Sequence, residues 1–281
     1  MITIADVTDL KQIYDYHLQF ETPYFFPVDY GTWKQSLDAD ADGEGRTLFR
    51  TLSLKAAYDG NDLVGFIQYG NTAFGFDSSG EISSDVSYCV IRNLYFNDGR
   101  ADAGSLLLQE AMDAFSAADT VYAFFHYFGM SCFARHGKLF ERHSHIEALL
   151  KQRGFQTEHE NVYYSSDLSG GEPSEVEILP QNPTKGNQQY MDFMLSGKSV
   201  GGCEIHYIDS RTAYLRWIYV NGDITGQGIG TKCMQALRHR LHREGFTRFD
   251  TDTALSNTAA QHYYGKTGFT REGITRSFYR T

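Results

Sequence analysis

The segment Asn221–Thr231 reads NGDITGQGIGT, and it lies between an apolar stretch, Ala213–Val220, and a run with helical spacing that begins at Ile229. Glycine occupies every second position from 226 to 230. A glycine-rich turn exposes its backbone N–H groups, and the start of a helix adds a partial positive charge. We therefore predict an anion-binding turn, for which a pyrophosphate is the natural ligand.

Two other phosphate-binding motifs do not fit the chain. Gly197-Lys198-Ser199 resembles the end of a P-loop, but residue 192 is Asp where that loop needs its first glycine. The dinucleotide-binding pattern also fails, because it requires a wider gap before its third glycine than the spacing at 226, 228 and 230.

A second segment, Asn257–Phe269, reads NTAAQHYYGKTGF and follows a predicted strand. Together the two segments resemble motifs A and B of the GNAT superfamily, the acetyl-CoA-dependent N-acetyltransferases. The residues that carry the second motif are Asn257, Ala260, Tyr264, Gly268 and Phe269. The resemblance covers roughly residues 190 to 281, and a fainter copy precedes it.

This resemblance implies acetyl-CoA as co-substrate. A splayed strand ending at Ile218-Tyr219-Val220 would bind the pantetheine arm, the glycine-rich turn would hold the pyrophosphate, and Asn257 would lie near the reactive end. The expected cofactor-binding residues are Ile218, Tyr219, Val220, Thr225, Gly226, Gln227, Gly228, Ile229, Gly230, Thr231, Asn257 and Lys266. Thr225 departs from the motif, which has Gln or Arg there, so we expect a weaker contact to phosphate.

The resemblance also implies the catalytic groups. Tyr264 would be the general acid that protonates the departing thiolate. Glu204 is the first candidate for the general base and Asp252 the second. Each has a structural alternative: Tyr264 as a core aromatic on an amphipathic helix, and the two carboxylates as ordinary surface or structural charge.

Histidines supply further base candidates, with the same structural alternative: His206, His239 and His242. His143 and His145 have no third ligand at metal-binding spacing, so no metal site is predicted.

The chain contains an internal repeat. Leu94–Asn97 and Ile218–Asn221 match in residue type at every position with an offset of 124 residues, and Gly154-Phe155 repeats Gly268-Phe269. We therefore predict two tandem copies of one α/β unit, an α+β mixed sheet in each. The predicted domains are 1–168, a degenerate GNAT-like copy; 169–188, a linker with the first strand of the next copy; and 189–281, the acetyl-CoA-binding domain.

The first copy has changed at the positions that would bind and react. Asp102 and Leu106 stand where the second copy has Gly226 and Gly230, and Leu150 stands in place of Tyr264. We expect this copy to have lost cofactor binding and catalysis. Its aromatic-rich segment 7–37 is expected to supply helices that complete or brace the acceptor pocket, because the second copy lacks such a segment.

Hydrophobic periodicity predicts the remaining elements. We expect helices over 7–20, 103–117, from 229 onward and over 257–266, and strands over 52–58, 63–69, 87–96, 190–195, 200–208, 213–220, 246–253 and 277–280.

Composition limits the classes of partner. Lys and Arg number 25 against 35 Asp and Glu, giving a net charge of −10 and a pI near 5.4. An acidic surface disfavours nucleic acid and anionic membranes and is compatible with a cationic amine substrate. The N-terminus lacks the layout of a signal peptide, so we expect a cytoplasmic protein, a monomer or homodimer with four reduced cysteines.

The sequence therefore predicts an N-acetyltransferase that transfers an acetyl group from acetyl-CoA to a primary amine of a small molecule by direct attack, with its active site in the C-terminal domain. Two alternatives remain open at this point: a non-catalytic acyl-CoA-binding sensor or scaffold, and a transferase for a longer acyl group.

Overall fold

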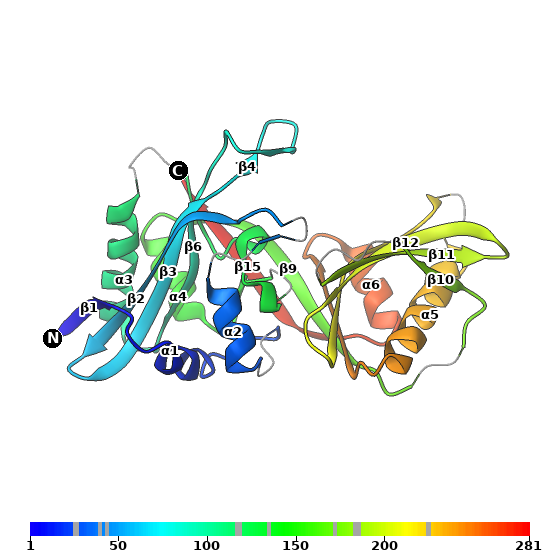
Figure 1. The fold of residues 1–281 in the computed structure, drawn as a ribbon, viewed down its shortest axis with the longest axis horizontal. Helices are drawn as coiled ribbons and strands as arrows, with labels where there is room; N and C mark the ends of the chain where they lie inside the picture. The colour runs from blue at the N-terminus through cyan, green and yellow to red at the C-terminus, as the bar shows by residue number, and fades with distance from the viewer. Residues whose placement is uncertain are drawn as a thin grey trace. The chain divides into compact units, whose positions relative to one another are not determined.

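The computed structural model describes residues 1–24, 28–38, 41–42, 45–115, 120–133, 136–170, 173–181, 187–222 and 226–281. Its strands and helices form two compact units, Met1–Glu160 with Thr275–Thr281 and Asn161–Ile274, here called unit 1 and unit 2. Each unit contains a mixed sheet with helices against it, so the predicted mixed α/β class is confirmed (Figure 1).

Unit 1 is built on one mixed sheet of order β1-β2-β3-β6-β7-β15. Its strands are β1 (Ile2–Asp6), β2 (Phe49–Asp59), β3 (Asp62–Thr72), β6 (Cys89–Phe96), β7 (Val121–Ala123) and the end of β15 (Thr270–Arg280), with β8 (Leu139–Phe140) beside β15 and a separate pair, β4 (Gly75–Phe76) and β5 (Ile82–Ser83). Its helices are α1 (Leu10–His17), α2 (Tyr30–Leu37), α3 (Ala101–Ala114) and α4 (Ser144–Gln152), with 3-10 turns η1 (His126–Phe128) and η2 (Ser131–Phe133).

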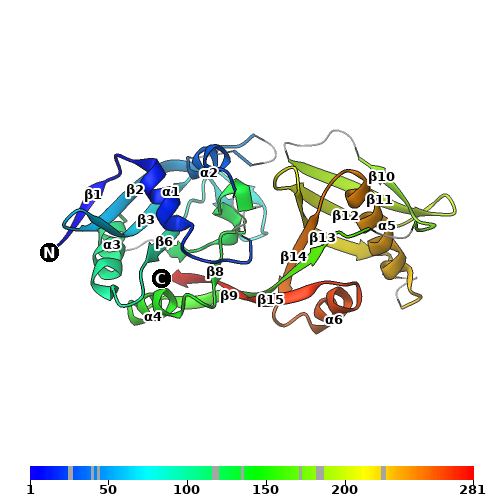
Figure 2. The ribbon, with the colours of Figure 1, turned by 90° about the horizontal axis from the view of Figure 1, so that it is seen from below.

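The sheet of unit 1 is covered on both faces, by α1 and α2 on one side and by α3 and α4 on the other (Figure 2). Phe66 of β3 contacts the His17 ring of α1, with ring centroids 5.3 Å apart. The adjacent Gly65 faces α3, where a Cβ would meet Leu107 at 2.9 Å. Successive residues of β3 thus face the helices on the two opposite faces of the sheet.

Unit 2 has a mixed sheet of order β9-β14-β13-β12-β11-β10, in which only β13 and β14 run parallel among the pairs described. Its elements are the end of β9 (Gln156–Asp167), β10 (Glu177–Pro180), β11 (Gln188–Leu195), β12 (Lys198–Tyr207), β13 (Thr212–Val220), β14 (Arg248–Ala254), α5 (Ile229–Arg243), α6 (Thr258–Lys266) and the start of β15. Ser196 and Gly197 have φ of 51° and 76°, the backbone that a two-residue hairpin turn between β11 and β12 requires.

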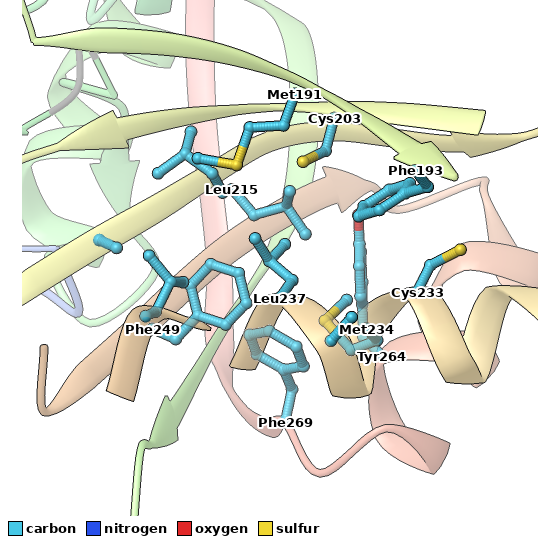
Figure 3. Packing of buried hydrophobic residues seen from close by; sticks show 14 of the residues in the cluster. Met191, Phe193, Cys203, Leu215, Cys233, Met234, Leu237, Phe249, Tyr264 and Phe269 are labelled. Atoms are coloured by element: carbon cyan, nitrogen blue, oxygen red, sulfur yellow. The ribbon is translucent and has the colours of Figure 1, made fainter. Parts of the chain in front are cut away.

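Helices α5 and α6 pack on one and the same face of this sheet (Figure 1). The apolar side chains of α5 pack against the strands, and Cys233, Leu237 and Leu241 are fully buried. Figure 3 shows Leu237 and Met234 of α5 with Tyr264 of α6 beneath strand residues such as Leu215. Among the residues that the structure describes in unit 2, no helix covers the opposite face.

The parallel strands of unit 2 pair only over their first halves. Pairing runs from Thr212 with Arg248 to Leu215 with Thr251 and then stops, although β13 continues to Val220 and β14 to Ala254. The strands therefore diverge after Leu215 and Thr251, as expected from the family resemblance. A bulge at Arg216, which lies between the partners of Ile205 and Glu204, begins the divergence.

Unit 1 repeats this feature at the same offset. Its parallel strands β6 and β7 pair only from Cys89 with Val121 to Ile91 with Ala123, and the bulged residue of β6 is Arg92, 124 positions before Arg216. The internal repeat inferred from Leu94–Asn97 therefore extends to backbone irregularities, which sequence matching alone does not detect.

Two strands are divided between the units. Strand β9 leaves unit 1 after Glu160, and its second half pairs with β14 of unit 2 from Asn161 to Asp167. Strand β15 leaves unit 2 after Ile274, and its end pairs with β7 and β8 of unit 1. The compact units therefore divide the chain after Glu160 and after Ile274, because each unit's sheet is completed by a strand that begins in the other.

None of the described helices is both long enough and apolar enough to span a bilayer.

The end of β15 gives a prediction for the stability of unit 1. Phe278 is fully buried and pairs with Ala123 of β7. We expect Phe278→Ala to lower the free energy of unfolding of unit 1 by about 3–5 kcal/mol, the range for removing a buried phenyl ring. Trp33, which lies buried in unit 1, reports this transition by fluorescence in a Trp217→Phe background.

The matched control is Phe269→Ala, which removes a buried ring from the core of unit 2 only nine positions away. Equal shifts of the Trp33 transition in both variants would contradict the assignment of the last seven residues to unit 1.

Candidate active site

The glycine-rich turn forms an open cradle at the start of α5. Gly226 and Gly228 have φ of 84° and 80°, and neither would bring a Cβ within 4 Å of another atom. Gly228 is the N-cap of α5 and no side chain caps the helix. Left-handed backbone favours glycine at both positions, and an uncapped helix start directs N–H groups at an anion. The geometry therefore suits the pyrophosphate that the sequence predicts.

Thr225 lies outside the described residues, so the predicted contact from its hydroxyl has no structural account. The neighbouring Gln227 is exposed, and Ile229, Gly230 and Thr231 form the first turn of α5. These residues lie together, as the sequence predicts.

Tyr263 ties α6 to this turn and was missed by the sequence analysis. Its hydroxyl donates to the Gly230 carbonyl at 2.8 Å, and its ring lies 3.4 Å from where a Gly230 Cβ would be. Gly230 thus serves close packing between the two helices as well as the cradle. The only sequence signal for this contact is the presence of an aromatic beside Tyr264 and a third glycine in the turn.

Tyr264 lies in the core of unit 2 and is 5 % exposed. Its ring packs between those of Tyr164 and Phe269, with centroids 5.6 and 5.5 Å away. Its hydroxyl bonds with the side chain of Thr251, the last β14 residue paired with β13. Burial raises the pKa of this phenol, and the bond to Thr251 acts in the opposite direction. The hydroxyl therefore lies where the strands begin to diverge.

The residues expected along the pantetheine arm divide between two faces of β13. Ile218 and Val220 pack against the core on the helix side. Tyr219 alternates with them, so its side chain is on the opposite face, where it is 49 % exposed. The backbone of Tyr219 lies on the diverging part of β13, but its side chain lies on the face of the sheet opposite α5 and α6.

Asn257 and Lys266 mark the two ends of α6. The Asn257 side chain accepts from the Ala260 N–H at 3.0 Å and so caps the helix. Lys266 is exposed in the last turn. Capping of α6 is thus a structural reason for an Asn at position 257.

Glu204 is 2 % exposed and already holds several partners. Its carboxylate bonds with His206 Nε2 at 2.6 Å, accepts from Trp217 Nε1 at 2.6 Å and lies 3.5 Å from Arg216. Burial acts to raise its pKa, but the bonds from His206 and Trp217 and the charge of Arg216 outweigh it, and the pKa is lowered. A buried carboxylate with a lowered pKa is poorly suited to take a proton directly from an amine.

Asp252 lies one residue beyond the last β13–β14 pair. It accepts from the Tyr214 hydroxyl at 2.5 Å and from Asn161 Nδ2 at 2.6 Å, and it is partly exposed. Alternation puts Asp252 on the face opposite Thr251 and Tyr264. The carboxylate and the phenol thus flank the same point of divergence from its two sides.

The other histidines of unit 2 have structural neighbours. His242 Nδ1 bonds with the Leu168 carbonyl at 2.9 Å, and His239 lies on the outer side of α5 beside Arg240 and Arg243. His206 bonds with Glu204 as described. Among the residues that the structure describes, no group of His, Cys, Asp and Glu could hold a metal ion.

The corresponding turn of the first copy has a different structure. Helix α3 begins at Ala101, one turn earlier than α5 at the 124 offset. Asp102 accepts from the Ala103 N–H at the helix start and pairs with Arg100 at 3.2 Å. Leu106 is exposed, and Leu150 is fully buried. A carboxylate thus occupies the position where an anion would bind.

The repeated glycine has also changed its role. Gly104, which aligns with Gly228 in sequence, lies inside α3, where a Cβ would come within 2.4 Å of the Phe96 ring. It permits close packing of helix on strand instead of a left-handed turn.

Comparison with known families fits this geometry. Residues 156–269 match the family model described as Acetyltransferase (GNAT) family. These residues form a GNAT domain. The resemblance to this family that the sequence predicts is therefore confirmed for this segment of the chain. The matching region includes β9, which the sequence resemblance left out, and ends at Phe269. Comparison with curated protein sequences gave no match.

Solved structures extend the likeness to both units. The glucosamine N-acetyltransferase region of a fungal multi-domain GH3 β-N-acetylglucosaminidase has a TM-score of 0.67 at 12% identity, over 100% of this chain and 38% of that one. A tandem GNAT protein from the clavulanic acid biosynthesis pathway has a TM-score of 0.65 at 12% identity, over 100% and 98%. A GNAT acetyltransferase from Colwellia psychrerythraea has 0.51 at 13%, over 99% and 98%. The fold is thus that of two GNAT-like domains in tandem.

The surroundings of Glu204 give a prediction about acid stability. Because the folded-state pKa is below the ordinary value, the stabilisation from its ionised bonds is present above about pH 4.5 and is lost as the pH falls through the folded pKa. We expect Glu204→Gln to lower the free energy of unfolding by about 2 kcal/mol at pH 7, with a smaller difference at pH 4, as measured by urea unfolding.

Glu244→Gln is the matched control, because Glu244 forms an exposed pair with Arg240 whose loss should cost less than about 1 kcal/mol. Wild-type stability of Glu204→Gln at pH 7, together with a large loss of kcat, would contradict the structural role and favour its assignment as the base.

Proposed function

We propose that the chain transfers an acetyl group from acetyl-CoA to a primary amine of a small molecule by direct attack, at the divergence of β13 and β14 in unit 2. The observation that carries this proposal is that Tyr264 and Asp252 lie on the two sides of the point where these strands separate. Tyr264 reaches Thr251 from the helix side, and Asp252 is the next residue on the opposite face. One group can supply a proton where the other can remove one.

The cradle supports acetyl-CoA as the donor. Gly226 and Gly228 leave open space at an uncapped helix start, which suits the pyrophosphate of coenzyme A. The unpaired edge of β13 from residue 216 onward offers backbone groups to a pantetheine amide. The residues that would hold the donor are those of the turn from Gly226 to Thr231 together with Ile218 and Val220.

The chemistry requires two proton movements. The amine nitrogen, once deprotonated, attacks the thioester carbonyl carbon, the C–S bond breaks and the thiolate leaves. Tyr264 would donate its proton to that thiolate. A phenol is a weaker acid than a thiol by about 1.5 pKa units, so the transfer costs about 2 kcal/mol. Burial, which raises the pKa of Tyr264, adds to this cost, and the bond with Thr251 offsets part of that increase.

Asp252 is the better candidate for the base. It lies at the divergence and is partly exposed, whereas Glu204 is buried with a lowered pKa. Tyr214 and Asn161 fix the position of its carboxylate. We assign Glu204 the role of holding His206 and Trp217 in place on the same face of the sheet.

The proposed acceptor class agrees with one structural relative. The fungal region of similar fold is described as a glucosamine N-acetyltransferase, whose acceptor is a primary amine on a small molecule. The acidic net charge of −10 is also compatible with an acceptor that arrives as an ammonium ion.

A charge placed in the cradle tests donor binding. We expect Gly228→Asp to weaken acetyl-CoA binding at least 10-fold in calorimetric titration, because its carboxylate would repel the pyrophosphate. Gly228→Asn is the control, since Asn is close in size, tolerates the left-handed backbone and carries no charge. Equal losses in both variants would indicate a steric effect, and wild-type affinity of the Asp variant would contradict binding in the cradle.

Tyr264→Phe tests the acid. We expect kcat to fall about 100-fold or more, with the KM for acetyl-CoA within about twofold, because Phe keeps the core packing. The readout is release of free coenzyme A with a panel of amines. Tyr263→Phe, which loses the bond to Gly230, should instead affect the KM for acetyl-CoA. Undiminished kcat in Tyr264→Phe would leave Tyr264 as a core aromatic, and binding of acetyl-CoA with no turnover of any amine would favour a sensor.

A further inference from the structure

Three aromatic side chains line the helix-free face of the sheet in unit 2. We call Tyr190 of β11 with Trp217 and Tyr219 of β13 the aromatic platform. The Tyr190 and Trp217 ring centroids are 5.9 Å apart, and those of Trp217 and Tyr219 are 5.7 Å apart. Tyr219 is 49 % exposed and the other two rings are partly exposed. A cluster of exposed aromatic side chains beside a candidate active site is typical of a ligand-binding surface.

Strand register explains how the platform forms. Tyr190, Glu204 and Trp217 occupy one row across β11, β12 and β13, and Tyr219 pairs with Gly202 in the next such row. The bulge at Arg216 shifts the alternation, so that Trp217 and Tyr219 turn away from the core while Ile218 and Val220 enter it. Without the bulge, the positions on the two faces would be exchanged.

The platform is held rigidly before any ligand arrives. Trp217 Nε1 donates to Glu204 Oε2 at 2.6 Å, which fixes the indole. Tyr219 lies over Gly202, where a Cβ would meet its ring at 3.1 Å. Gly202 therefore leaves room for the ring to lie against the sheet. Fixed aromatic surfaces bind with little loss of conformational entropy.

The charges beneath the platform do not favour a cation at this spot. The carboxylate of Glu204 faces Arg216 at 3.5 Å and also bonds with His206. The guanidinium of Arg216 is itself exposed on the strand between Leu215 and Trp217. A substrate ammonium placed here would meet this positive charge, whereas a neutral ring would meet only aromatic faces.

We propose that the aromatic platform binds the ring of the amine acceptor, so that the chain selects primary amines whose carbon skeleton is a ring, aromatic or sugar, over linear amines of equal size. This inference rests on the proposed function, because it concerns the acceptor at the same site. Ring faces stack on aromatic side chains in offset or edge arrangements, which linear chains match less well.

The platform lies at a suitable distance from the chemistry. At about 3.3 Å per residue along a strand, Trp217 is about 7 Å and Tyr219 about 13 Å beyond Leu215, the last β13 residue paired with β14. A ring resting on Trp217 thus lies near the end of the β13–β14 pairing, on the face of the sheet that carries Asp252.

The first experiment is a binding titration that needs no turnover. The chain has two tryptophans, and Trp33 is fully buried in unit 1, so changes in emission excited at 295 nm report on Trp217. The probes are benzylamine and glucosamine, which present an aromatic and a sugar ring, and n-heptylamine, a linear amine with the carbon number of benzylamine. At least one ring amine should change the emission saturably, and Trp217→Phe should abolish that change.

Substitutions at Tyr219 separate stacking from other effects. We expect Tyr219→Leu to weaken binding of the ring amine, and to raise its KM in the full-length enzyme, by about 3- to 10-fold. The kcat and the KM for acetyl-CoA should stay within about twofold. Tyr219→Phe keeps the ring and should resemble wild type. Leu179→Ala, an equally exposed apolar residue on β10, is the control for loss of surface area.

The outcomes distinguish this inference from the proposed function. Ring amines that bind at Trp217 without being acetylated would support the platform and overturn the function. Acetylation of n-heptylamine as efficient as that of both ring amines would overturn the platform and leave the function. A rise in the KM for acetyl-CoA alone in Tyr219→Leu would also overturn the platform, because Tyr219 would then line the donor site as the sequence predicts.

Discussion

The chemistry proposed for unit 2 depends on the place where two parallel strands stop pairing. Backbone groups normally find partners within a sheet, and an edge opened inside a sheet is left for a ligand or for another segment to satisfy. Beyond Leu215 and Thr251 neither β13 nor β14 is paired with the other. The cradle at α5, the hydroxyl of Tyr264 and the carboxylate of Asp252 all derive their proposed roles from their positions around this opening.

The two copies use the same backbone irregularity in different ways. In unit 1 the bulged Arg92 is buried, and its guanidinium donates to the carbonyls of Phe128 and Gly129, in and just after η1. The segment after β7 thus provides partners at the divergence of β6 and β7. In unit 2 the bulged Arg216 is exposed and pairs with Glu204. The first copy thus lacks the glycine turn and also provides its own partners at the divergence of β6 and β7.

Short-range signals in the sequence predicted most of the fold. The helical spacing from Ile229 onward predicted α5, and the strands predicted over 52–58 and 63–69 lie within β2 and β3. Strand β9 was not predicted, because all of its residues except Val162, Tyr163 and Tyr164 are polar and its partner β14 lies some 87 positions away. The sequence also gives no sign that β9 and β15 are shared between the two units, because pairing between distant strands has no local signature.

The candidate site was predicted as a set of residues but not as an arrangement. Motif spacing located Tyr264 and the glycines, since each belongs to a contiguous segment. It could not show that Glu204 is enclosed by His206, Trp217 and Arg216, because those partners are brought together by strand register and a bulge. For the same reason, alternation that ignores the bulge cannot tell which face of β13 Tyr219 occupies.

The exchange of strands has a consequence for the order in which the chain can fold. Multidomain proteins commonly fold from the N-terminus as they are synthesised. Here the sheet of unit 1 includes residues 278–280, paired with Val121–Ala123, and these residues are synthesised after all of unit 2. The edge of β7 in unit 1 is therefore unpaired with residues 278–280 while unit 2 is being translated. An exposed sheet edge is a liability for aggregation, and in unit 1 it lasts until Phe278–Arg280 are available to pair with β7.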